Sequence, residues 1–182
     1  MNELLTMLRD ATGRTSALVE SLGEDEFGLP TPCSEYDVRA LVNHLEWGAT
    51  LFESVAGDGP FVPQKEEFTG DFRERAERML AAWERPEAWE GASEAMGGMP
   101  KPVVANLALT DFAAHGWDLA RATGRSYEVE EDTARAMLAF ATQMAPMGRE
   151  RGAFGEEVAV PGDAPAFDRF LGVIGRDPAW KP

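Results

Sequence analysis

The sequence contains only two histidines, and both lie in segments whose apolar spacing predicts helices. His44 lies in the stretch LVNHL, and His115 follows Asp111 by four residues. Because residues four apart in a helix lie on one side, one turn from each other, Asp111 and His115 are expected to face the same way. Asp118, three residues further along, continues this side. A carboxylate among apolar residues is costly to bury, so Asp111 needs a partner that compensates its charge.

A divalent cation is one such partner, and an imidazole from a facing helix is the natural third ligand. His44, Asp111 and His115 therefore form a candidate metal site. One carboxylate and two imidazoles suit zinc, nickel or iron(II), and they leave coordination positions open for water or a substrate. The same spacing also fits an ordinary hydrogen bond between Asp111 and His115 in a bundle without metal. The spacing alone leaves both interpretations open.

Asp118 has two possible roles at its position. Its carboxylate could accept a hydrogen bond from the distal nitrogen of a metal-bound imidazole, or order a bound water, because such a histidine usually needs a further partner. Alternatively, it could pair with Arg39 or Arg121 and tie two helices together. The ion pair is the interpretation that we favour.

Cys33 is the single cysteine, which excludes an intramolecular disulfide framework and a cysteine-rich zinc site. It precedes a predicted helix, whose dipole could lower the pKa of the thiol. Eleven residues separate it from His44, which is about three helical turns or about 16 Å along the axis, too far to bind beside it. We therefore expect Cys33 to be a small buried residue beside a helix start.

Apolar periodicity and helix-stop residues predict the elements that must position these side chains. Helices are expected over residues 2–22, 71–84, 103–123 and 130–145, with a short last helix after 163. Another helix is expected to begin at 34–37, where Ser34 and Asp37 resemble a capping box, and to end at 56. Pro146 is expected to stop the helix before it. Residues 57–70 and 91–100 are predicted loops, and 148–162 an irregular stretch with a short extended piece at 157–160. The pattern predicts an all-α bundle, with residues 1–182 forming one domain.

Charge and composition exclude several classes of function. The chain has 182 residues, 32 acidic against 17 basic, and a net charge of −15. This argues against nucleic acid or an anionic membrane as a partner, because both require clustered Lys and Arg. The N-terminus lacks the basic region of a secretory signal, and no apolar stretch is long enough to span a membrane. We expect a cytoplasmic protein, a monomer or a homodimer.

Several segments resemble a known family. Residues 31–39 and 41–45 (TPCSEYDVR and LVNHL) and 115–124 (HGWDLARATG) are similar to the actinobacterial branch of the DinB/YfiT-like metalloenzymes. This branch is related to the N-terminal domain of mycothiol-dependent maleylpyruvate isomerase. Residues 154–158 and 175–180 also resemble it. The resemblance implies a DinB-like four-helix bundle with an additional C-terminal helical segment, and a metal held between helices. On the family motif, the metal ligands are His44, Asp111 and His115, with Glu in the isomerase branch where this chain has Asp111.

The resemblance further implies a low-molecular-weight thiol as cosubstrate, mycothiol in related enzymes. The isomerase has a further C-terminal domain at its active site, and we expect no equivalent in this chain. Zinc is the metal that we expect, and nickel is the alternative.

Three hypotheses about function follow. The first is a metal-dependent enzyme whose metal lowers the pKa of bound water toward about 7, or holds the thiol as a thiolate. The water or thiolate would attack an electrophilic substrate, as in a thiol transferase, a thiol-dependent isomerase or a hydrolase. In this hypothesis His44, Asp111 and His115 hold the metal, and no catalytic residue is assigned. The second is a non-catalytic bundle that binds a metal or a small ligand in a stress response. The third is a scaffold in which Asp111 and His115 only share a hydrogen bond.

Overall fold

The computed structural model of the protein describes residues 2–65 and 69–182. In these residues it has six α-helices: α1 (Glu3–Glu20), α2 (Val38–Ala56), α3 (Phe72–Trp83), α4 (Lys101–Ala122), α5 (Glu131–Glu150) and α6 (Ala166–Val173). The connections contain the short 3-10 helices η1 (Glu24–Glu26), η2 (Pro86–Trp89) and η3 (Glu94–Met96), and the strands β1 (Ala92–Ser93) and β2 (Met99–Pro100). The prediction of an all-α fold is confirmed.

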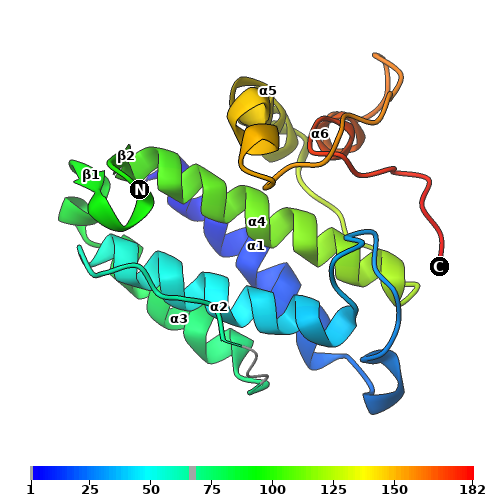
Figure 1. Ribbon diagram of the computed structural model, residues 1–182, viewed down its shortest axis with the longest axis horizontal. Coiled ribbons are helices and arrows are strands. Elements are labelled where there is room, and N and C mark those ends of the chain that lie inside the picture. Colours follow the sequence, from blue (N-terminus) through cyan, green and yellow to red (C-terminus); the bar gives the residue numbers. More distant parts are fainter. Residues whose placement is uncertain (1, 66–68) are drawn as a thin grey trace.

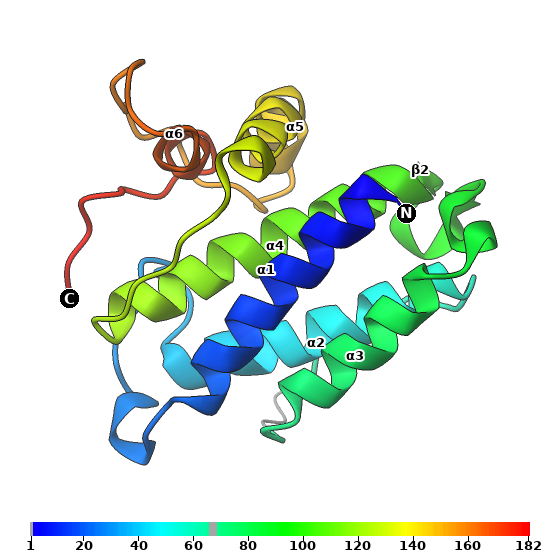
Figure 2. The same cartoon turned by 180° about the vertical axis from the view of Figure 1, so that it is seen from behind.

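Helices α1 to α4 form a four-helix bundle (Figure 1). Helix α1 packs on α4 and α3, and α2 packs on α3 and α4, so that each of the four has two neighbours in the bundle. Helices α5 and α6 pack on each other, and α5 contacts α4 from outside the bundle; Figure 2 shows this pair from behind. The predicted DinB-like bundle with an additional C-terminal helical segment is thus confirmed, and α5 and α6 are that segment.

Helix α4 is the central helix of the molecule. Of its 22 residues, 16 are buried, because it is covered by α1, α2 and α5. A helix that is buried on most sides needs small and apolar residues all round, and the alanines of α4 supply them. His115 and Asp118 are among its buried polar residues. Their polar atoms must therefore find partners inside the protein.

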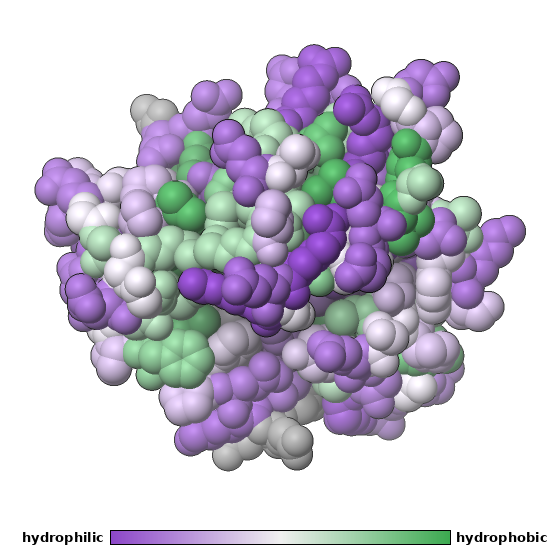
Figure 3. All heavy atoms as spheres, turned by 45° about the horizontal axis from the view of Figure 1, so that its top comes forward, coloured by the Kyte–Doolittle hydropathy of each residue, from purple (hydrophilic) through white to green (hydrophobic). Residues whose placement is uncertain are grey.

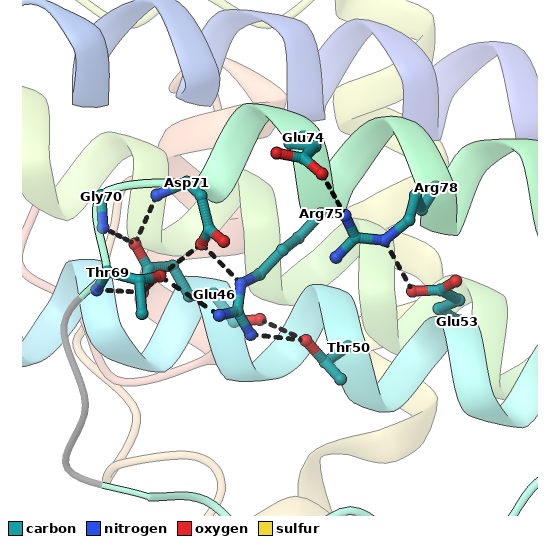
Figure 4. Close-up of polar contacts among 9 residues, drawn as sticks. All are labelled: Glu46, Thr50, Glu53, Thr69, Gly70, Asp71, Glu74, Arg75 and Arg78. Carbon is teal, nitrogen blue, oxygen red and sulfur yellow. Dashed lines mark hydrogen bonds and ion pairs between the residues drawn. The ribbon is translucent and has the colours of Figure 1, made fainter.

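A buried carboxylate fixes the start of α3 to α2. Glu46 is 1% exposed, and its carboxylate accepts backbone hydrogen bonds from Thr69 (3.0 Å), Gly70 (2.7 Å) and Asp71 (3.1 Å) (Figure 4). Asp71 is the N-cap residue of α3, and its own side chain makes no capping hydrogen bond. Glu46 therefore binds the N–H groups of the N-cap residue and of the two residues before it from a neighbouring helix, and its negative charge lies near the positive end of the helix dipole.

Some predicted boundaries differ from the structure. Helix α2 is capped by Asp37, whose side chain accepts a hydrogen bond from the backbone N–H of Ala40 at 2.8 Å, and not by Ser34. The stretch 91–100 contains the paired strands β1 and β2. The extended piece expected at 157–160 is not a strand, although the N–H of Val158 donates to the carbonyl of Gly172.

The prediction that Pro146 ends the fifth helix is wrong, because α5 continues to Glu150. A proline inside a helix removes one backbone hydrogen bond. Tertiary contacts hold the last turn in its place. A Cβ on Gly148 would lie 2.5 Å from the ring of Phe154, so glycine is needed for this contact. Arg149 donates to the carbonyls of Gly155 and Val173, which joins this turn to the segment before α6 and to the last residue of α6.

The surface agrees with the acidic composition. Hydrophilic side chains cover most of the face shown in Figure 3, with hydrophobic residues in smaller patches between them. Phe61 is the large apolar side chain that stands out among the described residues, at 52% exposure. None of the helices in the described part of the chain combines the length and the apolar content that crossing a bilayer requires.

Candidate functional site

The structure brings the three predicted metal ligands together between α2 and α4. Nε2 of His44 lies 3.3 Å from Oδ1 of Asp111, and Nε2 of His115 lies 3.5 Å from the same oxygen. The two imidazole rings meet edge to face, with centroids 4.9 Å apart. One donor atom of each residue lies within 4.8 Å of the others, as ligands of a single ion must. We call these three residues the metal cluster.

A glycine on α2 makes room for the carboxylate. Gly48 lies one turn after His44, and a Cβ at this position would lie 3.2 Å from Oδ2 of Asp111. That distance is shorter than an ordinary contact, so a side chain at Gly48 would push the carboxylate away. The missing side chain therefore lets α2 and α4 approach closely enough for His44 to reach Asp111 across the helix interface.

The outer nitrogen of each imidazole has a separate partner. Nδ1 of His115 lies 2.9 Å from Oδ2 of Asp118, which is fully buried. Nδ1 of His44 lies 3.4 Å from both the hydroxyl of Tyr36 and Oε1 of Gln64. Both rings therefore turn Nδ1 away from the cluster and Nε2 toward Asp111.

Asp118 makes the hydrogen bond to the distal nitrogen of His115 that we considered for it. The arginine that contacts Asp118 is Arg176, whose Nη2 lies 3.2 Å from Oδ2 of Asp118. It is neither Arg39 nor Arg121, the two arginines that we expected. Arg39 stacks over the ring of Phe27, and Arg121 donates to carbonyls of the C-terminal tail. The pairing with Arg39 or Arg121 is therefore wrong, because both side chains are directed to other partners.

The hydrogen-bond partners at the metal cluster leave a place for positive charge, either a proton or a cation. A neutral imidazole has one N–H. When this proton lies on Nδ1, Asp118 accepts it from His115, and Gln64 or the hydroxyl of Tyr36 can accept it from His44. Each Nε2 then presents a lone pair to the oxygen of Asp111. Lone pairs that face a carboxylate repel it unless a proton or a cation lies between them.

The pKa shifts express the same attraction for positive charge. Burial lowers the pKa of His44, but the negative charge of Asp111 and its hydrogen bond outweigh burial, and the pKa of His44 is raised above its ordinary value. Burial raises the pKa of Asp111, but the charge and hydrogen bond of His44, with His115, bring it below the ordinary value. In the absence of metal, a proton and the carboxylate charge thus stabilise each other here.

A cavity of about 360 Å³ opens beside the metal cluster. Its walls come from α2 and α4, from residues 32–36 before α2, and from residues 152–155 and 175–176 in the C-terminal part of the chain. In Figure 1 these walls are the blue segment before α2 and the orange and red segments around α6. The cavity has the size of a small-ligand site, and the cluster lies in its wall.

Cys33 lines this cavity, contrary to its expected position. Its sulfur lies within 4.8 Å of donor atoms of His115 and Asp118. The expected distance assumed a helical path to His44, but α2 begins only at Val38, and the chain before it folds across the cavity. Nor is the thiol activated: burial raises the pKa of Cys33, with Arg176 opposing and Asp118 adding to the shift.

Three residues around the site were missed from the sequence: Tyr36, Gln64 and Arg176. The segment after α2 runs back along this helix, because Trp47 donates to the carbonyl of Val62 (2.6 Å) and Asn43 to that of Lys65 (2.9 Å). These two hydrogen bonds place Gln64 beside His44. The spacing of Asn43 and Trp47, four residues apart on one face of α2, is the one signal that could have indicated this return.

Comparisons with known proteins agree with the resemblance found in the sequence. The family model described as "Mycothiol maleylpyruvate isomerase N-terminal domain" matches residues 8–120, which include the whole metal cluster. Two curated relatives are described as uncharacterized proteins, MT0763 of Mycobacterium tuberculosis (strain CDC 1551 / Oshkosh) and Rv0738 of Mycobacterium tuberculosis (strain ATCC 25618 / H37Rv). Each is 29% identical, over 88% of this chain and 91% of the relative. No solved structure matches the chain.

Proposed function

The chain belongs to the mycothiol maleylpyruvate isomerase N-terminal domain family, and on this premise we propose that it is a divalent-metal-binding enzyme that uses a low-molecular-weight thiol. His44, Asp111 and His115 hold the metal, for which zinc is the first choice and nickel the second. Mycothiol is the thiol that the family's description names. The reaction is of the transferase or isomerase type, on a small electrophilic substrate in the cytoplasm.

One observation carries this proposal: two imidazole nitrogens point at the same carboxylate oxygen from two helices. Their distances of 3.3 and 3.5 Å are long for good hydrogen bonds, whereas Asp118 and His115 make a normal one at 2.9 Å. A hydrogen bond between Asp111 and His115 alone does not require His44 to point at the same oxygen. A metal site made of two nitrogens and one oxygen does require this, and such a ligand set suits zinc and nickel.

The side chain of Asp111 is shorter than the Glu of the isomerase branch, and the fold compensates for the difference. The close approach at Gly48 brings the carboxylate of Asp111 within reach of His44. The residues therefore fit a metal without the additional methylene.

The other residues prepare the cavity for a ligand. Asp118 and the pair Tyr36 and Gln64 hold the two imidazoles with Nε2 toward the cluster. Burial raises the pKa of Tyr36, so its hydroxyl keeps its proton at neutral pH and can donate to a ligand in the cavity that it lines. When bound, the metal would act as a Lewis acid that favours the thiolate form of a thiol at neutral pH.

Elemental analysis tests the metal, and turnover tests the enzyme. Protein purified without a histidine tag and supplied with zinc or nickel at neutral pH should hold about one metal per chain, and His115→Ala should hold far less. Below about 0.1 metal per chain, the scaffold hypothesis would replace the proposal. The loaded protein is then incubated with mycothiol and a panel of electrophiles. Turnover above that of His115→Ala is expected, and metal binding without turnover would favour the non-catalytic bundle.

A further inference from the structure

Arg176 reaches the site from outside the bundle, and nothing in the proposed function uses it. It lies beyond α6, and its side chain is 11% exposed. Its Nη2 lies 3.2 Å from Oδ2 of Asp118, and its Nη1 lies 3.4 Å from the carbonyl of Ile174. The positive charge of Arg176 is thus already compensated by Asp118. A role in holding Asp118 agrees with this pairing better than the capture of an anionic ligand.

One oxygen joins Arg176 to the metal cluster. Oδ2 of Asp118 contacts both Nη2 of Arg176 and Nδ1 of His115. Oδ1 of Asp118 and Nε of Arg176 are buried and have no hydrogen-bond partner in the part of the chain that the structure describes. The carboxylate is therefore held by two contacts to one oxygen, and loss of Arg176 leaves His115 as the remaining partner of that oxygen. A buried carboxylate that has lost its positively charged partner is poorly compensated, so it is expected to leave the orientation that it has in the wild type.

We propose that Arg176 is a positioning residue: it holds Asp118 so that His115 keeps its proton on Nδ1 and presents Nε2 to the metal cluster. The C-terminal segment outside the family match at residues 8–120 would in this way complete the site that the bundle begins. The consequence for metal affinity rests on the proposed function. The consequence for the His115 proton does not, because it exists in the metal-free protein.

The experiment uses Arg176→Met, Arg176→Lys and a matched control, Arg121→Met. Arg121 donates to the carbonyls of Pro178 and Trp180, so its loss loosens the same tail without touching Asp118. Two imidazoles in the whole chain make nitrogen NMR of the histidines easy to assign. In metal-free wild-type protein at neutral pH, His115 should show one tautomer with the proton on Nδ1. Arg176→Met should shift it to a mixture, whereas Arg176→Lys should largely restore it and Arg121→Met leave it unchanged.

Zinc affinity, measured by competition with a chelator, is the second readout. Arg176→Met should weaken binding about 10- to 100-fold, the usual effect of losing a partner behind a metal-bound histidine, and Arg121→Met by less than about threefold. If Arg176→Met does not fold, Arg176→Gln carries the test, because it also removes the charge that holds Asp118 and should produce the same tautomer mixture.

Three results separate the outcomes. An unchanged tautomer in Arg176→Met would overturn the proposal, as would equal effects of Arg176→Met and Arg121→Met, which would make the role structural. A shifted tautomer in a protein whose wild type binds no metal would support the positioning role and end the proposed function.

Discussion

Replacing Asp111 by Asn removes one negative charge from the metal cluster and keeps the shape of the side chain. Oδ1 of Asp111 lies 3.3 Å from Nε2 of His44. Two unit charges at this separation interact by about 5 kcal/mol at an effective dielectric constant of about 20. The Asp111 side chain is 24% exposed, and solvent screens part of this energy. A net loss of about 3–4 kcal/mol is therefore expected in the attraction between a protonated His44 and residue 111. Zinc loses a charged ligand in the same variant, so its affinity should fall by at least about 10- to 100-fold.

The same substitution acts on His44 in the metal-free protein. Burial lowers the pKa of His44, and Asp111 is the main reason that this pKa is nevertheless raised. The pKa of His44 should therefore be lower in Asp111→Asn than in the wild type. A raised folded-state pKa contributes stability below the unfolded value of about 6.5, and this contribution is lost as the pH rises through the folded value. Relative to wild type, the variant should therefore lose more unfolding free energy at about pH 5.5 than at about pH 8.

Competition titrations with a chelator give the zinc affinity, and NMR of the histidines gives the pKa of His44. The matched control is Asp132→Asn, the same change of charge on α5, where the side chain is 91% exposed and far from the cluster in sequence and fold. The control should bind zinc as the wild type does. A zinc affinity for Asp111→Asn within about threefold of wild type would show that Asp111 is not a ligand. A His44 pKa that stays raised would refute the electrostatic account of the cluster.

Three further substitutions test separate parts of the structure. Gly48→Ala should raise helix stability by up to about 1 kcal/mol, because alanine favours a helix more than glycine does. It should nevertheless weaken zinc binding, because the new Cβ would lie 3.2 Å from Oδ2 of Asp111. Urea unfolding measures the first effect and zinc titration the second. Glu46→Gln should lower the unfolding free energy by about 2–3 kcal/mol and leave zinc affinity unchanged, because the amide group would face the backbone N–H groups of residues 69–71 just before α3. The midpoint of urea unfolding measures this loss. Cys33→Ser should leave zinc affinity unchanged, and the cobalt-loaded wild type should lack a thiolate charge-transfer band; such a band would point to Cys33, His115 and Asp118 as the ligand set instead.

The metal cluster could be predicted because local rules govern it. Asp111 and His115 are four apart on one helix, so their shared side follows from helix geometry alone. The partner helix could not be found in this way, because nothing in the spacing relates His44 to Asp111 across 67 residues. The family motif supplied that link. The bundle itself followed from the apolar periodicity of its helices.

The missed features all depend on contacts between distant segments. Arg176 pairs with Asp118 over 58 residues, and no local pattern distinguishes it from the arginines that we favoured. Pro146 stays inside α5 because tertiary contacts at Gly148 and Arg149 outweigh the lost hydrogen bond. The position of Cys33 is a partial exception. The prolines at 30 and 32, which exclude a helix there, already indicated that helical distances do not apply.

In the proposed function the reacting thiol comes from outside the chain, and the chemistry around Cys33 agrees with this. The single cysteine lines the cavity, but burial raises its pKa and keeps it in the unreactive thiol form. A free thiol that enters the cavity instead meets a cluster that attracts positive charge and is suited to a metal. The bundle supplies this cluster, whereas residues 152–155 and 175–176 close the cavity from outside the family match. A relative with the same bundle and a different C-terminal segment should therefore keep the metal cluster, as defined by its three residues, and admit a different ligand.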